Sequence, residues 1–350
     1  MSEKVFMSGN VALAEGAIAG GCRYFFGYPI TPQNQIPQYM AEHLPEVGGV
    51  YLQAESEVAA VNMLYGAAST GSYVMTTSSS PGISLMQEGL SYMSGAELPC
   101  VVVNMVRGGP GLGNIAPAQS DYWLATRGAG HGDSRCLTFA PASVQELHDW
   151  AAMAFPIAQK YRSIVMILGD AILAGMNEPV KLRERIDPPP RDQDWRIGGY
   201  RKGRERRIVN SLWTDAPVMQ EVNFRIKERF DEAKKNETRW DEYGSASPDI
   251  ILAAYGISAR ICQTVVDWLD DRGIAARLIR PISLFPFPTE IFIEWSEKVD
   301  RIFVVELSMG QFVEDVRLAV EGRCPVELIW NTGGVLYTPE DVLQRIQDRL

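Results

Sequence analysis

Three short segments of this sequence carry the residues best suited to chemistry. Thr31 lies between Pro29 and Pro32, Glu57 begins a nearly apolar stretch, and Arg107 ends an apolar run before a glycine-rich loop. The two prolines restrict the backbone of a turn around the threonine hydroxyl. A carboxylate can hold or move a proton, and a guanidinium can bind an anionic substrate. We therefore interpret the three segments as part of an active site.

Glu57 stands at the start of a predicted helix whose following residues are poor in polar groups. A carboxylate from which water is excluded can serve as an acid or a base. Alternatively, Glu55 and Glu57 complement the positive end of the helix dipole, and the residues alone fit both hypotheses. The apolar residues that follow are Val58, Ala59, Ala60, Val61, Met63, Leu64, Ala67 and Ala68.

Arg107 follows the predicted strand 101–106, at the edge where α/β folds bind their ligands. Its planar guanidinium can hold a carboxylate with two hydrogen bonds, although a surface arginine paired with an acid is the simpler interpretation of one residue. Thr31 also has two interpretations. Its hydroxyl can donate to a substrate oxygen, or it can cap a helix that starts at Pro32.

Short runs of branched apolar residues alternate with helical patterns along the chain. Such fully apolar strands predict a parallel sheet with helices on both faces, and a second α/β unit begins near Asp249. Ser8 is predicted to cap a helix that Gly20 ends, and Thr338 to cap the last helix. The predicted strands include 24–28, 73–77, 100–106, 164–168, 275–279, 301–306 and 326–330.

The composition changes between about residues 178 and 247. Three consecutive prolines at 188–190 and the basic run 201–207 cannot build a core, so we predict a linker or an extended arm. The segment 224–243 is rich in Lys, Arg and Glu and is interpreted as a solvated helix. We expect the basic run to be an exposed face or a contact with a partner subunit.

Bulk composition excludes several classes of protein. The 350 residues carry a net charge of -10 with a pI of about 5.0, which argues against nucleic acid or an anionic membrane as a partner. Five scattered cysteines without a CxxC pair supply no iron–sulfur site, so any electron acceptor must lie on another chain. No stretch approaches the ~20 apolar residues of a membrane span. The sequence predicts a cytoplasmic protein.

The ordered set of motifs resembles the α subunit of the 2-oxoacid:ferredoxin oxidoreductases, thiamine-diphosphate enzymes that decarboxylate 2-oxoacids to acyl-CoA. The resemblance is closest to the branched-chain type, which acts on 2-oxoisovalerate (3-methyl-2-oxobutanoate). It implies a pyrimidine-binding (Pyr) domain over 1–180, a linker over 181–246 and a transketolase C-terminal-like domain over 247–350. Besides the three segments above, the matching motifs are Gly66–Ser69, Thr76–Gly82, Gln119–Asp121 and Gly130–Asp133.

The resemblance also implies roles for individual residues. Glu57, nine residues before Gly66, matches the glutamate beside the aminopyrimidine of thiamine diphosphate. Glu55 then either complements the helix dipole or supports the site without touching the ligand. Arg107, eight residues after Pro99, matches an arginine that binds substrate, and Thr31 matches a threonine beside the substrate carboxylate. The cofactor side would be lined by Pro29 and Ser80. A solvated turn is the alternative at Ser78–Ser80, and a structural histidine is favoured over a proton-transfer residue at His131.

The segment Leu168–Ala171 differs from the Gly-Asp-Gly signature that binds magnesium and diphosphate, because Ala171 replaces the second glycine. We interpret it as a strand end. The resemblance therefore implies that a β subunit binds the diphosphate and magnesium, and that ferredoxin-like γ and δ subunits carry iron–sulfur clusters. Ferredoxin and CoA complete the expected partners.

Other functions stay open at this point. The substrate could be 2-oxoglutarate, pyruvate or an aryl 2-oxoacid, or the chain could be a non-catalytic assembly subunit. A nucleotide-binding dehydrogenase is disfavoured, because no GxGxxG follows the first strand. Gln119 and Asp121 match the family pattern, but the residues alone give them no role.

Overall fold

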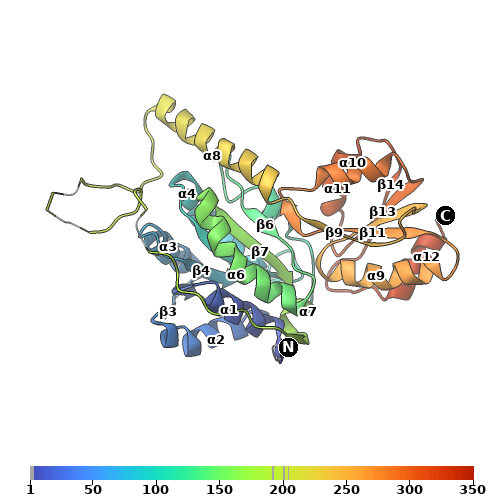
Figure 1. The fold of residues 1–350 in the computed structure, drawn as a ribbon, viewed down its shortest axis with the longest axis horizontal. Helices are drawn as coiled ribbons and strands as arrows, with labels where there is room; N and C mark the ends of the chain where they lie inside the picture. The colour runs from blue at the N-terminus through green and yellow to red at the C-terminus, as the bar shows by residue number, and fades with distance from the viewer. Residues whose placement is uncertain (1–3, 191–192, 200–201, 204) are drawn as a thin grey trace.

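The computed structural model describes residues 4–190, 193–199, 202–203 and 205–350. Figure 1 shows two lobes side by side, with the long helix α8 (Ala216–Asn236) crossing the top of the first lobe toward the second. In the described part of the chain the strands form sheets of seven, five and two strands. The first lobe contains the seven-stranded sheet and the second contains the five-stranded sheet.

The seven-stranded sheet has the order β12-β6-β7-β5-β4-β2-β3 and is parallel except for β12. Its two central strands are fully buried, as expected for a parallel sheet covered on both faces. The predicted α/β fold is therefore confirmed. The strands are β2 (Tyr24–Gly27), β3 (Val50–Gln53), β4 (Val74–Ser78), β5 (Cys100–Val106), β6 (Leu137–Phe139), β7 (Ile164–Asp170) and β12 (Ser283–Phe285).

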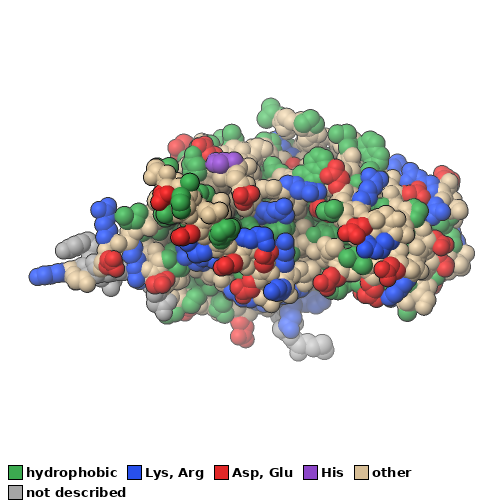
Figure 2. Space-filling model, turned by 90° about the horizontal axis from the view of Figure 1, so that it is seen from above, with side chains coloured by type: hydrophobic (Ala, Val, Ile, Leu, Met, Phe, Trp, Pro, Cys, Tyr) green, Lys and Arg blue, Asp and Glu red, His purple; other side chains and the backbone are tan. Residues whose placement is uncertain are grey.

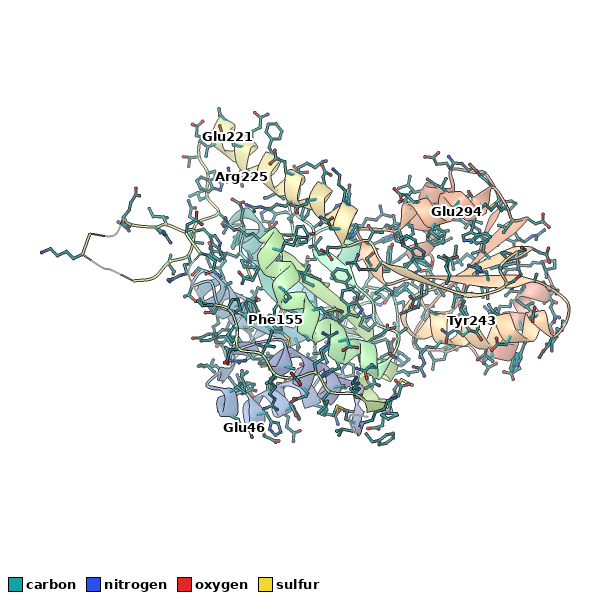
Figure 3. All side chains as sticks on the ribbon, in the orientation of Figure 1. Glu46, Phe155, Glu221, Arg225, Tyr243 and Glu294 are labelled. Carbon is teal, nitrogen blue, oxygen red and sulfur yellow. The ribbon has the colours of Figure 1, made fainter. Side chains whose placement is uncertain are left out.

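Helices cover both faces of this sheet, and alternate residues of β5 point to opposite sides. Val101 and Val103 join the core beneath α1 (Gly9–Ala19), α2 (Gln35–His43) and α6 (Val144–Tyr161). Val102 and Val106 join the core beneath α3 (Glu57–Ala68) and α4 (Ser80–Gly95). Phe155 of α6, labelled in Figure 3, is one of the large buried side chains of the first core.

The second lobe is built on the sheet β14-β13-β10-β11-β9. Its strands are β9 (Trp240–Gly244), β10 (Ile250–Ala253), β11 (Ala276–Pro281), β13 (Arg301–Glu306) and β14 (Val326–Trp330). Its helices are α9 (Gly256–Asp270), α10 (Thr289–Ser296), α11 (Phe312–Val320) and α12 (Pro339–Gln347).

Local capping explains where several of these helices begin. The Ser8 hydroxyl accepts a hydrogen bond from the Val11 N–H, and α1 ends with Gly20 as its C-cap, as the sequence predicts. Thr338 and Asp341 form a capping box at α12, which satisfies two otherwise unpaired backbone donors. Both predicted caps are confirmed.

The region 216–244 differs from the sequence prediction. The sequence predicts a helix over 224–243. The structure instead has α8 over Ala216–Asn236, and Trp240–Gly244 form the edge strand β9. The reason is tertiary, because β9 pairs antiparallel with β11 and Glu242 forms an ion pair with Arg277 at 2.6 Å. The Tyr243 hydroxyl donates to Asp267 at 2.7 Å, and Tyr243 is labelled over α9 in Figure 3. A segment whose charged residues are typical of a solvated helix thus forms the edge strand of a sheet.

Helix α8 is not a purely solvated helix either. Val222, Phe230 and Ala233 are buried against the first lobe. Arg225, labelled on α8 in Figure 3, donates to the buried Glu97 at 2.8 Å. Burial alone would raise the pKa of Glu97, but the arginine hydrogen bond and neighbouring guanidinium charges lower it below its usual value.

The first part of the connection between β8 (Asn177–Val180) and α8, residues 181–190, runs as extended chain along the first lobe. Arg185 pairs with the buried Glu15 at 3.0 Å and anchors its first part, while the Pro-rich segment follows. In the basic run, the residues at 202–203 and 205–207 are exposed, whereas Arg201 and Arg204 lie outside the described residues. The remaining short elements are β1 (Val5–Ser8), η1 (Pro45–Val47), α5 (Tyr122–Thr126) and α7 (Ala171–Gly175).

The distribution of charge on the surface and the burial of the cysteines fit the expectations from the composition. On the face drawn in Figure 2, basic and acidic side chains are interspersed rather than gathered by sign. All five cysteines are buried free thiols. Among the described helices, none combines the length and the apolar character that a bilayer crossing requires.

Candidate active site

The predicted site residues follow neighbouring strands of the seven-stranded sheet. Thr31 follows β2, Glu57 follows β3, Ser80 follows β4 and Arg107 follows β5. Since these strands are parallel, their carboxyl ends lie at one edge of the sheet. Residues up to 76 positions apart in sequence are thereby brought together.

Glu57 is the first residue of α3. The helix begins there because the Ser56 hydroxyl accepts a hydrogen bond from the Ala59 N–H at 3.2 Å. The Glu57 side chain is only 6% exposed, whereas Glu55 points to solvent. Within the described residues, the Glu57 carboxylate makes no hydrogen bond and no ion pair. Because its oxygens are not sealed from solvent, a ligand that donates a hydrogen bond can reach them.

The first turn of α4 forms the wall against which Glu57 lies. A Cβ atom at Gly82 would lie 2.5 Å from Glu57 Oε1 and 2.1 Å from Ser78 Oγ, so only glycine permits this approach. The hydroxyls of Ser78 and Ser79 are buried without a hydrogen-bond partner. Three polar groups around the start of α4 therefore lack partners among the described residues.

Arg107 is held in place by backbone carbonyls. Its Nη1 donates to the Thr31 carbonyl at 3.1 Å and its Nη2 donates to the Leu112 carbonyl at 3.0 Å. The Nε–H group is buried and has no partner. Since neither contact neutralises its charge, the guanidinium remains available to an anion. The structure thus brings Arg107 and Thr31 together, as the sequence predicts for a shared edge.

Thr31 does not cap a helix at Pro32. Helix α2 starts only at Gln35, because a turn in which the Gln33 N–H donates to the Ile30 carbonyl intervenes. The Thr31 hydroxyl accepts from the Asn34 side chain at 3.3 Å and is half-buried. That alternative is therefore wrong, while the hydroxyl still has a hydrogen to donate.

Two residues of this edge were missed in the sequence. Gln33 is fully buried, accepts from the Thr77 hydroxyl and donates to the Tyr28 carbonyl at 3.3 Å, which holds the proline-rich turn against β4. The sequence predicts Gly82 only as the last residue of the motif Thr76–Gly82. A polar residue directly after a Pro-rich turn is the only local signal for Gln33, and Gly82 has a signal only in its position beside Pro81.

The remaining predicted positions have structural surroundings. Pro29 is exposed after β2, and Ser80 is half-buried as the first residue of α4. The His131 ring is exposed, and its carbonyl accepts from Ser91 at 2.9 Å. Asp170 ends β7, so the predicted strand end is confirmed, and it accepts backbone hydrogen bonds from α7.

Comparison with known proteins agrees with this geometry. Residues 15–244 match the family described as pyruvate flavodoxin/ferredoxin oxidoreductase, thiamine diphosphate-binding, and residues 248–342 match the pyruvate:ferredoxin oxidoreductase core domain II. The chain belongs to the 2-oxoacid:ferredoxin oxidoreductase family. The predicted family is confirmed, and the chain is an oxidoreductase subunit of a thiamine-diphosphate-binding class that acts on 2-oxoacids.

Relatives within the family cover nearly the whole chain. A ketoisovalerate oxidoreductase subunit VorB from Methanothermobacter marburgensis is 44% identical over 98% of this chain and 97% of its own length. A 2-oxoglutarate synthase subunit KorA from Methanocaldococcus jannaschii is 33% identical over 96% of this chain and 97% of its own length.

Two solved structures share the fold. The 2-oxoglutarate:ferredoxin oxidoreductase from Magnetococcus marinus, with 2-oxoglutarate, coenzyme A and succinyl-CoA bound, is 25% identical with a TM-score of 0.86. The match covers 99% of this chain but 65% of that longer one. A split-gene transketolase is 14% identical with a TM-score of 0.61, over 98% of this chain and 97% of its own, a likeness of fold alone.

Proposed function

We propose that this chain is the α subunit that supplies the pyrimidine side of a shared thiamine-diphosphate site, with Glu57 as its catalytic carboxylate. The observation that carries the proposal is the buried Glu57 carboxylate, which lies against Gly82 and has no partner in the described chain. In this proposal the Pyr domain is 1–180, the linker 181–246 and the transketolase C-terminal-like domain 247–350.

The residues present fit the cofactor. An aminopyrimidine ring offers polar ring and amino groups, which match the unpartnered Glu57 carboxylate and the orphaned Ser78 and Ser79 hydroxyls. When bound, thiamine diphosphate supplies the carbon nucleophile and the electron sink for decarboxylation. Glu57 would hold or release the proton shared with the ring, in surroundings from which most water is excluded. Pro29 and Ser80 are proposed to line the cofactor side.

Arg107 and Thr31 are proposed to bind the 2-oxoacid. The carbonyls of Thr31 and Leu112 fix the plane of the guanidinium, while its free N–H groups can donate two hydrogen bonds to a substrate carboxylate. The Thr31 hydroxyl lies on the same turn and can donate to a substrate oxygen. The positive charge would hold the carboxylate until it leaves as CO2.

The proposed partners would bind the groups for which the described part of this chain offers no fitting site: the diphosphate, the magnesium and the iron–sulfur clusters. The Asp170 carboxylate caps α7, and no group of three metal-ligating side chains occurs within the described ranges. We therefore assign the diphosphate and magnesium to a β subunit, and the iron–sulfur clusters to ferredoxin-like γ and δ subunits. CoA and ferredoxin are the proposed co-substrate and electron acceptor, and the proposed location is the cytoplasm.

The proposed reaction converts a 2-oxoacid, CoA and oxidised ferredoxin into acyl-CoA, CO2 and reduced ferredoxin. We favour 2-oxoisovalerate because the 44% identical relatives over nearly the full chain are named ketoisovalerate oxidoreductase subunits. The alternative, 2-oxoglutarate, is the substrate named for relatives at 32–34% identity. Acyl-CoA formation by the purified complex from 2-oxoisovalerate, 2-oxoglutarate, pyruvate and an aryl 2-oxoacid distinguishes them.

The Glu57→Gln variant tests the catalytic assignment. It keeps the shape of the side chain but cannot share a proton, so we expect turnover of the assembled complex to fall by about 10²-fold or more. Glu55→Gln, an exposed neighbour, is the matched control and should keep turnover. A Glu57→Gln complex that assembles and turns over at the wild-type rate would mean that this chain has a scaffolding function only.

A further inference from the structure

The segment Gln119–Asp121 joins the two lobes. Gln119 is 3% exposed, and its side-chain oxygen accepts from the Ser258 hydroxyl at 2.7 Å and from the Leu307 N–H at 2.9 Å. Its side-chain nitrogen donates to the Tyr255 carbonyl at 2.9 Å, and its own N–H donates to the Leu307 carbonyl at 2.9 Å. All of these partners belong to the second lobe, so the position of Gln119 follows that lobe.

Gln311, just before α11 in the second lobe, makes a second attachment. Its side-chain nitrogen donates to the Ser120 carbonyl at 2.7 Å, and its oxygen accepts from the Trp123 N–H at 3.0 Å. Asp121 lies between these two bonded positions. The backbone on both sides of Asp121 is therefore held by the second lobe.

The Asp121 side chain turns the other way, toward the candidate site. Its carboxylate accepts from the Asn104 side chain at 2.9 Å. Asn104 lies in β5, the strand that Arg107 follows. Pro117, two residues before Gln119, forms an isolated β-bridge with Arg107. The backbone that carries Arg107 is thereby held by Asp121 through Asn104 and by the chain that leads into Gln119.

We propose that Gln119–Asp121 is a positioning segment through which the second lobe holds Arg107 in the geometry that binds substrate. The chain of contacts runs from Gln311 and Gln119 through Asp121 and Asn104 to the strand that ends at Arg107. Asp121 is a positioning residue rather than a catalytic one, since no contact among the described residues brings it to the Glu57 carboxylate. The inference rests on the proposed role of Arg107 in binding the 2-oxoacid.

Two variants test the segment in the assembled complex. Asp121→Ala removes the acceptor for the Asn104 side chain, and Gln311→Ala removes two hydrogen bonds from the second lobe while leaving the core filled. Each should raise KM for the 2-oxoacid about 10-fold, with kcat changed less than about twofold, because positioning of a binding group is lost while the proton-transfer group is intact. Glu314→Gln, on α11 and paired only with Arg127 at 3.6 Å, is the control and should leave both constants unchanged.

A double-mutant cycle separates this inference from the proposed function. If Asp121 acts through Arg107, Asp121→Ala should lower kcat/KM in the wild-type background but hardly at all in an Arg107→Ala background. Additive losses, losses in kcat rather than KM, or an unchanged KM in both single variants would overturn the inference. If Asp121→Ala does not fold, Gln311→Ala decides by the same criteria. If Arg107→Ala itself leaves KM unchanged, the substrate role of Arg107 is wrong and the inference falls with it.

Discussion

At the scale of single residues, the site is defined by groups whose partners are missing. Glu57 is buried without a donor, Arg107 keeps a buried N–H without an acceptor, and two serine hydroxyls are orphaned. Folded proteins rarely leave so many buried polar groups unpaired in one place. The types of Glu57 and Arg107 could be predicted from the sequence, because each stands at a strand end or helix start. Their lack of partners could not, since it depends on side chains from four strands.

Replacing Arg107 with lysine tests the planar recognition of the substrate. Lysine keeps the charge but loses the fixed fork that the Thr31 and Leu112 carbonyls orient. We expect KM for the 2-oxoacid to rise about 10-fold or more at nearly constant kcat, measured by initial rates of acyl-CoA formation. Equal KM values for the two enzymes would rule out bidentate binding by this residue.

Gly82→Ala tests the close approach at the start of α4. The added methyl group would collide with Ser78 Oγ and Glu57 Oε1, so the helix start or the carboxylate must move. We expect the isolated subunit to lose about 1–3 kcal/mol of its free energy of unfolding, as is typical of overpacking, and its melting temperature to fall accordingly. Gly66→Ala, in α3 with open space around its Cβ, should instead leave stability equal or raised. A Gly82→Ala subunit as stable as wild type would contradict the seating of Glu57.

At the scale of elements, α3 and α4 present an almost uncharged outer face. Val58 is 47% and Leu85 55% exposed, and Tyr92 extends the same face. The charge on this face comes from Glu88, an exposed residue of α4. Apolar side chains exposed together beside a site that needs another chain are typical of a subunit interface.

Leu85→Lys tests whether this face meets the proposed partner subunit. The side chain is exposed, so the isolated subunit should keep its stability, but a charge buried in an interface lacks compensation. We expect the fraction of assembled complex in size-exclusion chromatography to fall at least 10-fold. Leu318→Lys, on α11 with a 70% exposed leucine, is the control. Assembly by the Leu85→Lys variant at the wild-type level would place the interface elsewhere.

Elements with local signals are predicted well from the sequence, and those that depend on distant partners are not. Ser8 and Thr338 are caps whose bonding partners lie three residues further along the chain, so the sequence predicts α1 and α12. Strand β9 has two acidic residues among its five and forms because β11 and Arg277 lie beside it. Strand β12 has three residues and pairs with β6 across more than 140 positions. No local pattern distinguishes such strands from a loop or a helix.

At the scale of the whole molecule, the two lobes share buried contacts rather than a flexible hinge. Tyr122 of the first lobe packs against Tyr255 and Phe312 of the second, each with ring centroids 5.7 Å apart. Asp170 accepts hydrogen bonds from α7 of its own lobe, and its Oδ2 lies beside Gly256 of the second. The role of Gln119 could not be predicted, because its partners lie 136 to 188 positions away.

Asp170 gives this lobe contact a pH dependence. Burial raises the pKa of Asp170 from 3.8 to about 6, against the lowering effect of its backbone hydrogen bonds. The folded state therefore binds the proton more tightly than the unfolded state, so this contribution to stability is complete below about pH 4 and is lost as pH rises through 6. This contribution to the free energy of unfolding is about 3 kcal/mol.

Asp170→Asn removes the titration. We expect the free energy of unfolding of the variant minus that of wild type to increase between pH 4 and pH 7, as measured by urea unfolding, because only wild type loses this contribution. Asp271→Asn, an exposed carboxylate after α9, is the control and should show no such trend. Parallel pH profiles of wild type and Asp170→Asn would contradict a protonated Asp170 at low pH.

The most direct test of the central claim is the rate of hydrogen exchange at C2 of the thiazolium ring in assembled complexes loaded with thiamine diphosphate. This rate can be measured by NMR after quenching, without substrate, and so reports the proton transfer alone. If Glu57 shares its proton with the cofactor, Glu57→Gln should slow the exchange by about 10²-fold or more while Glu55→Gln exchanges at the wild-type rate. Equal exchange rates in wild-type and Glu57→Gln complexes that contain the same amount of cofactor would contradict the account.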